Sequence, residues 1–134
     1  MRYITTVDMK NEVVDWDNID QSDFSLTYDM CEKNEYGSFD NTVFMDILRS
    51  QEVKEPLAIV IYTHTGTKQI KIYSFEVNKK FRNTNIGRRL INGYCSRYDM
   101  VELSTLPETK IFYEKCLLHE EGNGRMVWRR GENL

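Results

Sequence analysis

The sequence predicts a single α/β domain in which strands and helices are mixed along the chain. From residue 57 onward, strand-like and amphipathic helical segments follow one another in the order strand, strand, helix, strand, helix, strand. A length of 134 residues suits one domain, and 40% hydrophobic with 29% charged residues is typical of a folded globular chain. No repeat, low-complexity tract or Pro/Gly-rich linker divides the sequence, so residues 1–134 are expected to fold as one unit.

The first 55 residues carry the weaker signals. Residues 3–7 are β-branched and aromatic, as in a first strand. Residues 13–36 allow two interpretations. A strand is favoured by the alternation with polar residues of Phe24, Leu26, Tyr28 and Met30, and the edge of a helix by Trp16, Ile19 and Asp20. Residues 40–48 predict a short helix capped by Asp40 or Asn41, with an apolar face made of Val43, Phe44, Ile47 and Leu48.

The sequence patterns that predict secondary structure are clearer after Pro56. Residues 57–62 and 70–77 are two β-rich runs, and the turn signal His64-Thr65-Gly66-Thr67 between them predicts a hairpin. A polar loop over residues 78–87 then opens onto a helix. The apolar face of this helix has the spacing i, i+4 and i+8 and consists of Ile86, Leu90, Ile91, Tyr94, Cys95 and Tyr98.

The last elements are shorter. Residues 101–103 predict a short strand. Residues 109–119 predict an amphipathic helix that carries Ile111, Phe112, Cys116 and Leu118. The turn Gly122-Asn123-Gly124 leads into a closing strand over residues 125–129.

Charge is divided unevenly along the chain. The net charge of −3 argues against a surface that binds nucleic acid or anionic membrane as a whole. Residues 1–55 hold 13 acidic and 5 basic residues, whereas residues 56–134 hold 8 acidic and 13 basic residues. A division of this kind calls for a functional explanation.

The cysteines and histidines argue against a disulfide-rich protein and against a metal site. Cys31, Cys95 and Cys116 are odd in number, widely spaced and without a CxxC pair, so we expect free packing thiols in a reducing, cytoplasmic compartment. His64 and His119 have no cysteine or carboxylate at ligand spacing, so no metal is expected. No run approaches the roughly 18 apolar residues of a membrane span.

The loop before the long helix is the segment most informative about chemistry. It enters the helix through Asn85-Ile86-Gly87, where unpaired backbone N–H groups and the helix dipole favour an anion. Five basic residues surround this position with no acid among them: Lys79, Lys80, Arg82, Arg88 and Arg89. A phosphate or pyrophosphate site is the direct interpretation. The alternative is a solvated basic face in which Gly87 only closes a turn.

This segment resembles the acyl-CoA-binding motif of the GNAT N-acetyltransferases, Gln/Arg-x-x-Gly-x-Gly/Ala between the central strand and the next helix. Arg82 matches the first position and Gly87 the last, while Phe75 and Val77 occupy the usual apolar strand positions. Asn85 stands where the first glycine is expected. Because asparagine tolerates positive φ better than other non-glycine residues, the loop shape is expected to survive.

The resemblance continues downstream and covers roughly residues 56–130, while residues 1–55 match no recognised pattern. Residues 101–104 are similar to the family's next strand, residues 111–116 to its "FYEK" helix, and residues 125–128 to its closing strand. Leu106 replaces a frequent asparagine, and Leu117-Leu118 replaces a Gly-Phe pair. The resemblance implies a GNAT-like α/β fold with a mixed, mainly antiparallel central sheet flanked by helices.

The resemblance also implies direct transfer of an acetyl group from acetyl-CoA, the co-substrate, to a primary amine, without a covalent enzyme intermediate. The pyrophosphate would rest on backbone N–H groups of the loop, and the pantetheine arm would bond to the strand backbone like an added strand. The residues implied in cofactor binding are Phe75, Glu76, Val77, Arg82, Asn83, Thr84, Asn85, Ile86, Gly87 and Arg88.

Two catalytic residues are expected from the same resemblance. Tyr113 occupies the family's tyrosine position and is the candidate acid that protonates the departing thiolate, since phenol and thiol have pKa values of roughly 10 and 8.5. The alternative for Tyr113 is packing at the core. Glu76, beside the expected thioester, is the first candidate for the base. Weaker candidates are Glu102, His64, His119 and a chain of waters.

The acceptor and the partners are predicted only in outline. The acidic first 55 residues favour a cationic acceptor, either a small amine or a protein lysine or N-terminus, with a solvated acidic face as the alternative. A nucleic-acid acceptor and a membrane partner are disfavoured, and a homodimer is left open. The alternative function is a GNAT-like module with weak or no turnover that binds CoA or a protein partner.

Overall fold

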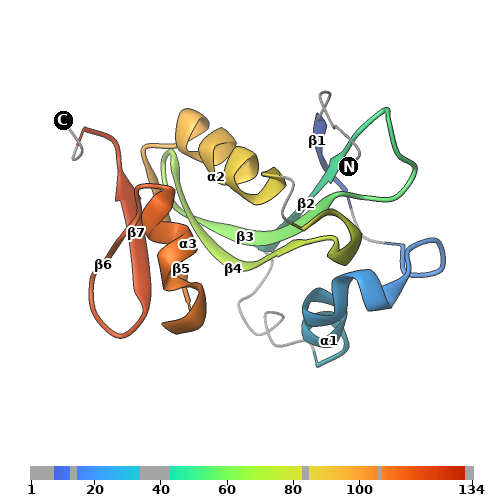
Figure 1. The fold of residues 1–134 in the computed structure, drawn as a ribbon. Coiled ribbons are helices and arrows are strands. Elements are labelled where there is room, and N and C mark those ends of the chain that lie inside the picture. Colours follow the sequence, from blue (N-terminus) through green and yellow to red (C-terminus); the bar gives the residue numbers. More distant parts are fainter. Residues whose placement is uncertain (1–7, 13–14, 34–42, 83–84, 106, 132–134) are drawn as a thin grey trace.

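The computed structural model describes residues 8–12, 15–33, 43–82, 85–105 and 107–131. Its strands form one seven-stranded sheet in the order β1-β2-β3-β4-β5-β7-β6 (Figure 1). Neighbouring strands pair antiparallel except β4 and β5, which pair parallel. The strands are β1 (Asp8–Asn11), β2 (Val43–Arg49), β3 (Ala58–Gly66), β4 (Gln69–Val77), β5 (Met100–Ser104), β6 (His119–Glu120) and β7 (Arg125–Arg129). The predicted mixed, mainly antiparallel sheet flanked by helices is confirmed.

Helices lie on both sides of this sheet. Figure 1 shows α2 and α1 on opposite sides of its β3–β4 part. Short 3₁₀ turns precede α1 and α3, and a third lies in the loop between β4 and α2. The helices are α1 (Ser25–Lys33), α2 (Ile86–Arg97) and α3 (Lys110–Lys115), and the turns are Gln21–Phe24, Lys79–Phe81 and Pro107–Thr109. No helix of the described ranges is long and apolar enough to cross a membrane.

The two faces of the sheet carry cores of different size. Successive strand residues point to opposite faces, so β3 contributes Val60 to one core and Ile59 to the other. The larger core lies under α2 and includes Leu90 and Tyr94. The smaller core lies on the opposite face, on the side of α1, and consists of Phe24 from the 3₁₀ turn before α1 with Ile47 and Ile59, and Trp16, Ile19 and Met45 pack against it.

The predicted β3–β4 hairpin is confirmed, with its turn two residues later than expected. β3 continues to Gly66 and pairs with β4 from Ala58↔Val77 to Gly66↔Gln69. The chain reverses at residues 67–68, where Lys68 has a φ of 57°. His64 therefore lies in the strand and not in the turn.

The helix expected at residues 40–48 is wrong, because residues 43–49 form strand β2. This strand pairs with β1 on one side and β3 on the other. Leu48 packs in the core under α2 and Ile47 in the core under α1. A strand that is buried on both faces does not alternate apolar with polar residues. The apolar residues of β2 therefore have a spacing that is also compatible with one face of a helix. Asp40 and Asn41 lie outside the described residues.

The segment left open at residues 13–36 is helical in its described second part. Asp20 caps the 3₁₀ turn, because its carboxylate accepts a hydrogen bond from Ser22 N–H at 3.0 Å. Phe24 and Thr27 are fully buried, whereas Leu26 is exposed. The strand-like alternation in this segment therefore does not correspond to a strand. The strand expected at residues 3–7 lies outside the described residues.

The helix expected at residues 109–119 is shorter than predicted. It ends at Lys115, and Leu117 adopts a left-handed backbone with a φ of 72°. This turn lets both Cys116 and Leu118 reach the core, while Ile111, expected on the apolar face, is exposed. His119 then enters β6. The predicted strands at residues 101–103 and 125–129 are confirmed as β5 and β7.

Candidate active site

The sheet opens between its two parallel strands. β4 and β5 pair from Gln69↔Met100 to Ile72↔Leu103, and the described pairing goes no further. Beyond Ile72, β4 continues to Val77 in its pairing with β3. The end of β4, residues 73–77, therefore has a partner strand on one side only.

The backbone N–H and C=O groups at the end of β4 alternate between β3 and the opening. Asn78 N–H donates to Leu57 C=O on the β3 side at 2.8 Å. Because backbone groups alternate along an antiparallel ladder, those of Glu76 also face β3, and those of Phe75 and Val77 face the opening. Val77 C=O already accepts a hydrogen bond from Arg82 Nε at 3.2 Å. The opening therefore presents backbone groups that an extended ligand can pair with.

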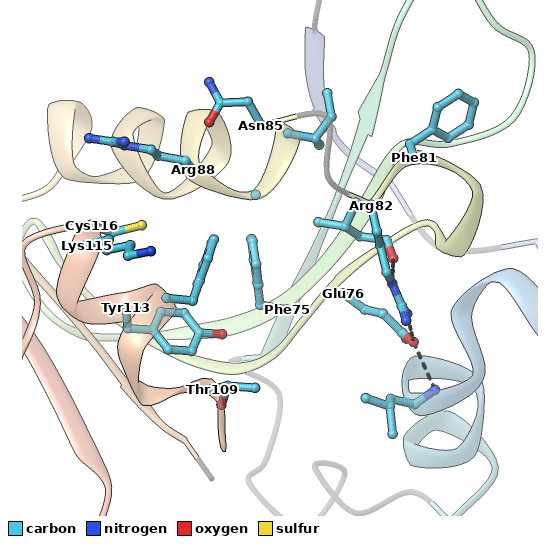
Figure 2. A pocket seen from close by; sticks show the side chains of 15 residues that line it. Phe75, Glu76, Phe81, Arg82, Asn85, Arg88, Thr109, Tyr113, Lys115 and Cys116 are labelled. Atoms are coloured by element: carbon cyan, nitrogen blue, oxygen red, sulfur yellow. Dashed lines mark hydrogen bonds and ion pairs between the residues drawn. The ribbon is translucent and has the colours of Figure 1, made fainter. Parts of the chain in front are cut away.

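A cavity of about 560 Å³ lies at this opening. It is lined by Tyr113 and by all the described residues that were predicted to bind the cofactor (Figure 2): Phe75, Glu76, Val77, Arg82, Asn85, Ile86, Gly87 and Arg88. They come from β4, the following loop, α2 and α3. Asn83 and Thr84 lie outside the described residues. The structure therefore brings together residues that are spread along the sequence from Phe75 to Tyr113.

The N-terminus of α2 forms one wall of the cavity. Asn85 has φ 67° and ψ 10°, the left-handed conformation expected for it, and its side chain makes no capping hydrogen bond. The first backbone N–H groups of a helix have no partner within the helix, and the helix dipole adds positive potential. Arg88 also lines the cavity from the first turn. This wall has the donors and the charge that an anion needs.

Gly87 allows close packing at the same wall. A Cβ atom built on Gly87 would lie 3.0 Å from Cζ of Phe112 and 3.5 Å from Cζ of Phe75. The rings of Phe75 and Phe112 stack with centroids 6.3 Å apart. The missing side chain of Gly87 thus lets the Phe112 ring of α3 approach α2. Gly87 therefore serves the packing of α2 against α3.

Tyr113 directs its phenol oxygen into the cavity (Figure 2). Its ring packs edge-on against Phe112, with centroids 5.0 Å apart. Burial raises the pKa of Tyr113 to about 12, and the nearby Cys116 thiol adds to the shift. The phenol therefore carries its proton at neutral pH, as a proton donor must.

Glu76 is buried, and both of its carboxylate oxygens are engaged. Oε1 accepts hydrogen bonds from Thr27 N–H at 2.7 Å and from Thr27 Oγ1 at 2.6 Å. Oε2 accepts one from Leu26 N–H at 3.2 Å and contacts the Arg82 guanidinium at 3.5 Å. The carboxylate thus satisfies the free N–H groups at the start of α1. Its role as a base stays a prediction, and it has a structural task in addition.

The other candidate bases do not line the cavity. Glu102 accepts a hydrogen bond from Arg125 Nε at 2.7 Å, and His119 Nε2 lies 2.9 Å from Glu121 Oε2. His64 packs against the aromatic rings of Phe44, Tyr62 and Tyr98. Among the described residues, no group of three or more His, Cys, Asp or Glu is placed to hold a metal ion.

Sequence reasoning missed several residues of the cavity wall. Phe112, Lys115 and Cys116 lie in or next to the "FYEK" segment, so that motif already pointed to them. Leu26 lies in the segment left open and had no signal of its own. The full set missed is Leu26, Phe81, Thr109, Phe112, Lys115 and Cys116.

The two cysteines near the cavity have raised pKa values. Burial raises the pKa of the Cys116 thiol, and it raises that of Cys95 to about 12. A thiol with a raised pKa is a weak nucleophile at neutral pH. This agrees with the packing role expected for both residues.

Comparison with known proteins defines the fold. No family model and no curated protein matches the sequence. An acetyltransferase from Thermus thermophilus has a TM-score of 0.67 at 11% identity, covering 96% of this chain and 99% of its own. A spermidine N-acetyltransferase chimera from Vibrio cholerae and a second protein has a TM-score of 0.64 at 14% identity, covering 96% and 98%. A Bacillus subtilis acetyltransferase in complex with CoA has a TM-score of 0.59 at 13% identity, covering 90% and 93%.

The similarity extends over almost the whole length of each of these chains. The chain therefore has the fold of the GNAT acetyltransferases, as the sequence resemblance implied. Residues 1–55, which matched no pattern in the sequence, take part in this fold through β1, α1 and β2.

Proposed function

We propose that this protein is an acyl-CoA-dependent N-acyltransferase that transfers an acetyl group from acetyl-CoA to a primary amine. One observation carries the proposal: Tyr113 and every described residue predicted to bind the cofactor line one cavity, at the point where β4 and β5 separate. That cavity combines an anion-binding wall with an open strand edge and a protonated phenol.

The described wall fits the chemical parts of acetyl-CoA. The N-terminus of α2 together with Arg88 supplies N–H donors and positive charge for phosphates. Lys115 of α3 and Arg82 of the loop are further cations of the lining. The backbone groups of Phe75 and Val77 that face the opening match the amide groups of an extended pantetheine arm, although Val77 C=O also accepts a hydrogen bond from Arg82.

The chain's own residues then favour each stage of a direct transfer. The acetyl thioester supplies an activated carbonyl carbon, on which the amine nitrogen forms a bond as the carbon–sulfur bond breaks. A backbone N–H of β4 at the opening stabilises the negative charge that develops on the carbonyl oxygen. Tyr113 holds a proton at its phenol oxygen for the departing sulfur. The proton of the amine leaves through Glu76 or water.

The experiment measures cofactor binding and turnover separately. Acetyl-CoA should raise the melting temperature of the full chain, because a ligand that binds the folded state stabilises it by mass action. CoA release should then follow the addition of an amine. Tyr113→Phe should lower kcat by about 100-fold or more, within the usual range for loss of a general acid. Tyr98→Phe, whose ring lies outside the cavity, is the matched control.

No stabilisation at millimolar acetyl-CoA would contradict the cofactor assignment. Normal turnover by Tyr113→Phe would remove the role given to that residue. Replacement of Asn85 by glycine should keep or improve CoA affinity, because the left-handed backbone it adopts is the one glycine favours.

A second candidate function is a GNAT-like module that binds CoA or a protein without efficient turnover. The observation in its favour is the engaged carboxylate of Glu76, which accepts four hydrogen bonds from three residues, Leu26, Thr27 and Arg82. Stabilisation by acetyl-CoA without CoA release from a broad panel of amines would support this module over the enzyme.

A further inference from the structure

Leu26 occupies an unusual position for a leucine. It is 70% exposed, yet it lines the cavity. Of the described residues before position 56, it is also the only one that does so. Its backbone N–H is held by Glu76 of β4, so its position is fixed relative to the central strand. An exposed apolar side chain held at a cavity wall is available to contact a ligand.

The wall formed by Leu26 is the acceptor's side of the cavity, if the proposed function holds. α1 and α2 lie on opposite sides of β4 (Figure 2). The N-terminus of α2, with Arg88, suits the cofactor's phosphates. The amine must therefore reach the thioester from the remaining side, which is the side of α1.

That side offers little to a polycation. Glu76 is the only acidic residue among the described residues that line the cavity, and its two oxygens are occupied. The other charged groups of the lining are basic: Arg82, Arg88 and Lys115. Among the described acids of the first 55 residues, Asp23 pairs with Lys80 at 3.3 Å and Glu12 with Arg49 at 2.9 Å. A second positive charge on the acceptor would therefore meet Arg82 and find no free carboxylate among the described residues of the lining.

We infer that the acceptor is a primary amine carried on an apolar group, and that Leu26 is the residue that selects it. The inference rests on the proposed function and makes its substrate class narrower. It also replaces the cationic acceptor that the division of charge along the sequence favoured.

An apolar wall also assists the chemistry. Desolvation disfavours an ammonium ion and lowers the pKa of the amine, so the neutral nucleophile is favoured. The ammonium releases its proton to water on entering, the neutral nitrogen bonds to the carbonyl carbon as the carbon–sulfur bond breaks, and the sulfur takes the phenol proton of Tyr113, which water then returns. The second amine proton is lost to water or Glu76, so amide and free thiol are the balanced products. A dedicated base is then less important.

The test compares two amines with the full chain. Phenethylamine is an apolar monoamine and spermidine a polycation, and CoA release is followed for each at saturating acetyl-CoA. We expect kcat/KM for phenethylamine to exceed that for spermidine by about tenfold or more, because both the lost apolar contact and the charge repulsion disfavour spermidine. Melting temperature with and without acetyl-CoA is measured in parallel.

Variants then test Leu26 itself. Leu26→Ala should raise KM for phenethylamine about five- to tenfold, with KM for acetyl-CoA unchanged. Leu26→Met, which keeps the apolar volume, should retain the wild-type KM. Ile111→Ala is the matched control, because Ile111 is also exposed, at 64%, and does not line the cavity.

The outcomes separate the inference from the proposed function. Preference for spermidine, or an unchanged KM in Leu26→Ala, overturns the inference while leaving the acyltransferase intact. Stabilisation by acetyl-CoA without turnover of phenethylamine also overturns it. Absence of both stabilisation and CoA release overturns the proposed function and the inference together.

Discussion

The two helices beside β4 are attached to the sheet by different forces. α2 covers the larger core, where Leu90, Ile91 and Tyr94 are at most 2% exposed. The smaller core, on the side of α1, has only three buried members, Phe24, Ile47 and Ile59, which precede α1 or lie in the sheet, and the first turn of α1 bonds to the single carboxylate of Glu76. Apolar packing tolerates small shifts of its parts, whereas hydrogen bonds fix direction and distance. The proposed cofactor side of the site thus lies on a well-packed helix, and the proposed acceptor side lies on a helix held by polar contacts.

The largest effect is expected from Leu90→Ala in the core under α2. Leu90 is 2% exposed, so its truncation removes buried apolar contacts and leaves a cavity. The free energy of unfolding should fall by about 2–5 kcal/mol. Urea denaturation followed by circular dichroism measures this loss. A loss under about 1 kcal/mol would contradict the view that apolar packing holds α2.

Glu76→Gln should have a smaller and more local effect. An amide in place of the carboxylate directs an NH₂ group toward donors of α1, and the unsatisfied groups should cost about 1–3 kcal/mol. Hydrogen exchange should become faster at the amides of Leu26 and Thr27 and remain unchanged within α2. This measurement also separates two roles of Glu76. A residue that acted only as a base would lose activity without any change in exchange at α1.

Tyr94→Phe tests a polar contact that α2 makes with the distant strand β2. The phenol of Tyr94 donates to Asp46 Oδ2 at 2.7 Å, and both residues are buried. Loss of this bond should destabilise the fold by about 1–2 kcal/mol, because hydrogen bonds to charged groups are stronger than neutral ones. Thermal denaturation at pH 7 measures the change. Asp46 keeps contacts with Tyr62 and Asn11, which limits the loss.

Tyr94→Phe should also change how the stability of the protein depends on pH above 10. Burial, with Asp46 nearby, raises the pKa of Tyr94 well above its usual value of 10. In the unfolded chain the phenol ionises near pH 10, so its contribution to stability is complete below pH 10 and declines above it. Stability of the wild type should therefore fall above pH 10, and that of Tyr94→Phe should fall less steeply. Equal slopes would contradict this assignment.

The smallest effect is expected at Glu121, which lies far along the chain from both helices. Hydrogen bonds from Arg129 and His119 lower the pKa of Glu121 to about 2. Its contribution is present above the ordinary pKa of 4.5 and is lost as the pH falls toward 2. Glu121→Gln should show a shallower loss of melting temperature between pH 4.5 and pH 2 than the wild type. Because the group is exposed, solvent screening keeps this difference small.

The contrast between the two helices also explains how much the sequence could predict. β4, the following loop and α2 are specified locally, by β-rich residues, a polar loop and an apolar helical face, and the sequence predicts all three. The left-handed Asn85 is expected from its place in the motif. These local patterns, together with the "FYEK" segment, predict nine site residues that line one cavity in the structure.

The N-terminal part depends on contacts between residues far apart in sequence. Residues 43–49 form a strand because β1 and β3 pair with it, and no local pattern carries that information. α1 is positioned by Glu76, which is 50 residues from Leu26. A single sequence shows neither the pairing nor this bond, so Leu26 and the engaged state of Glu76 could only come from the structure.

The separation of β4 from β5 has a mechanical consequence. Only four parallel residue pairs, Gln69↔Met100 to Ile72↔Leu103, join strands β1 to β4 with strands β5, β7 and β6. Strand pairing is therefore shortest along this seam, with the cavity at its open end, and the core under α2 supplies the other connection between the two parts of the sheet. An extended molecule bonded to Phe75 and Val77 would lengthen the connection at the open end. Its binding should slow hydrogen exchange at the ends of β4 and β5.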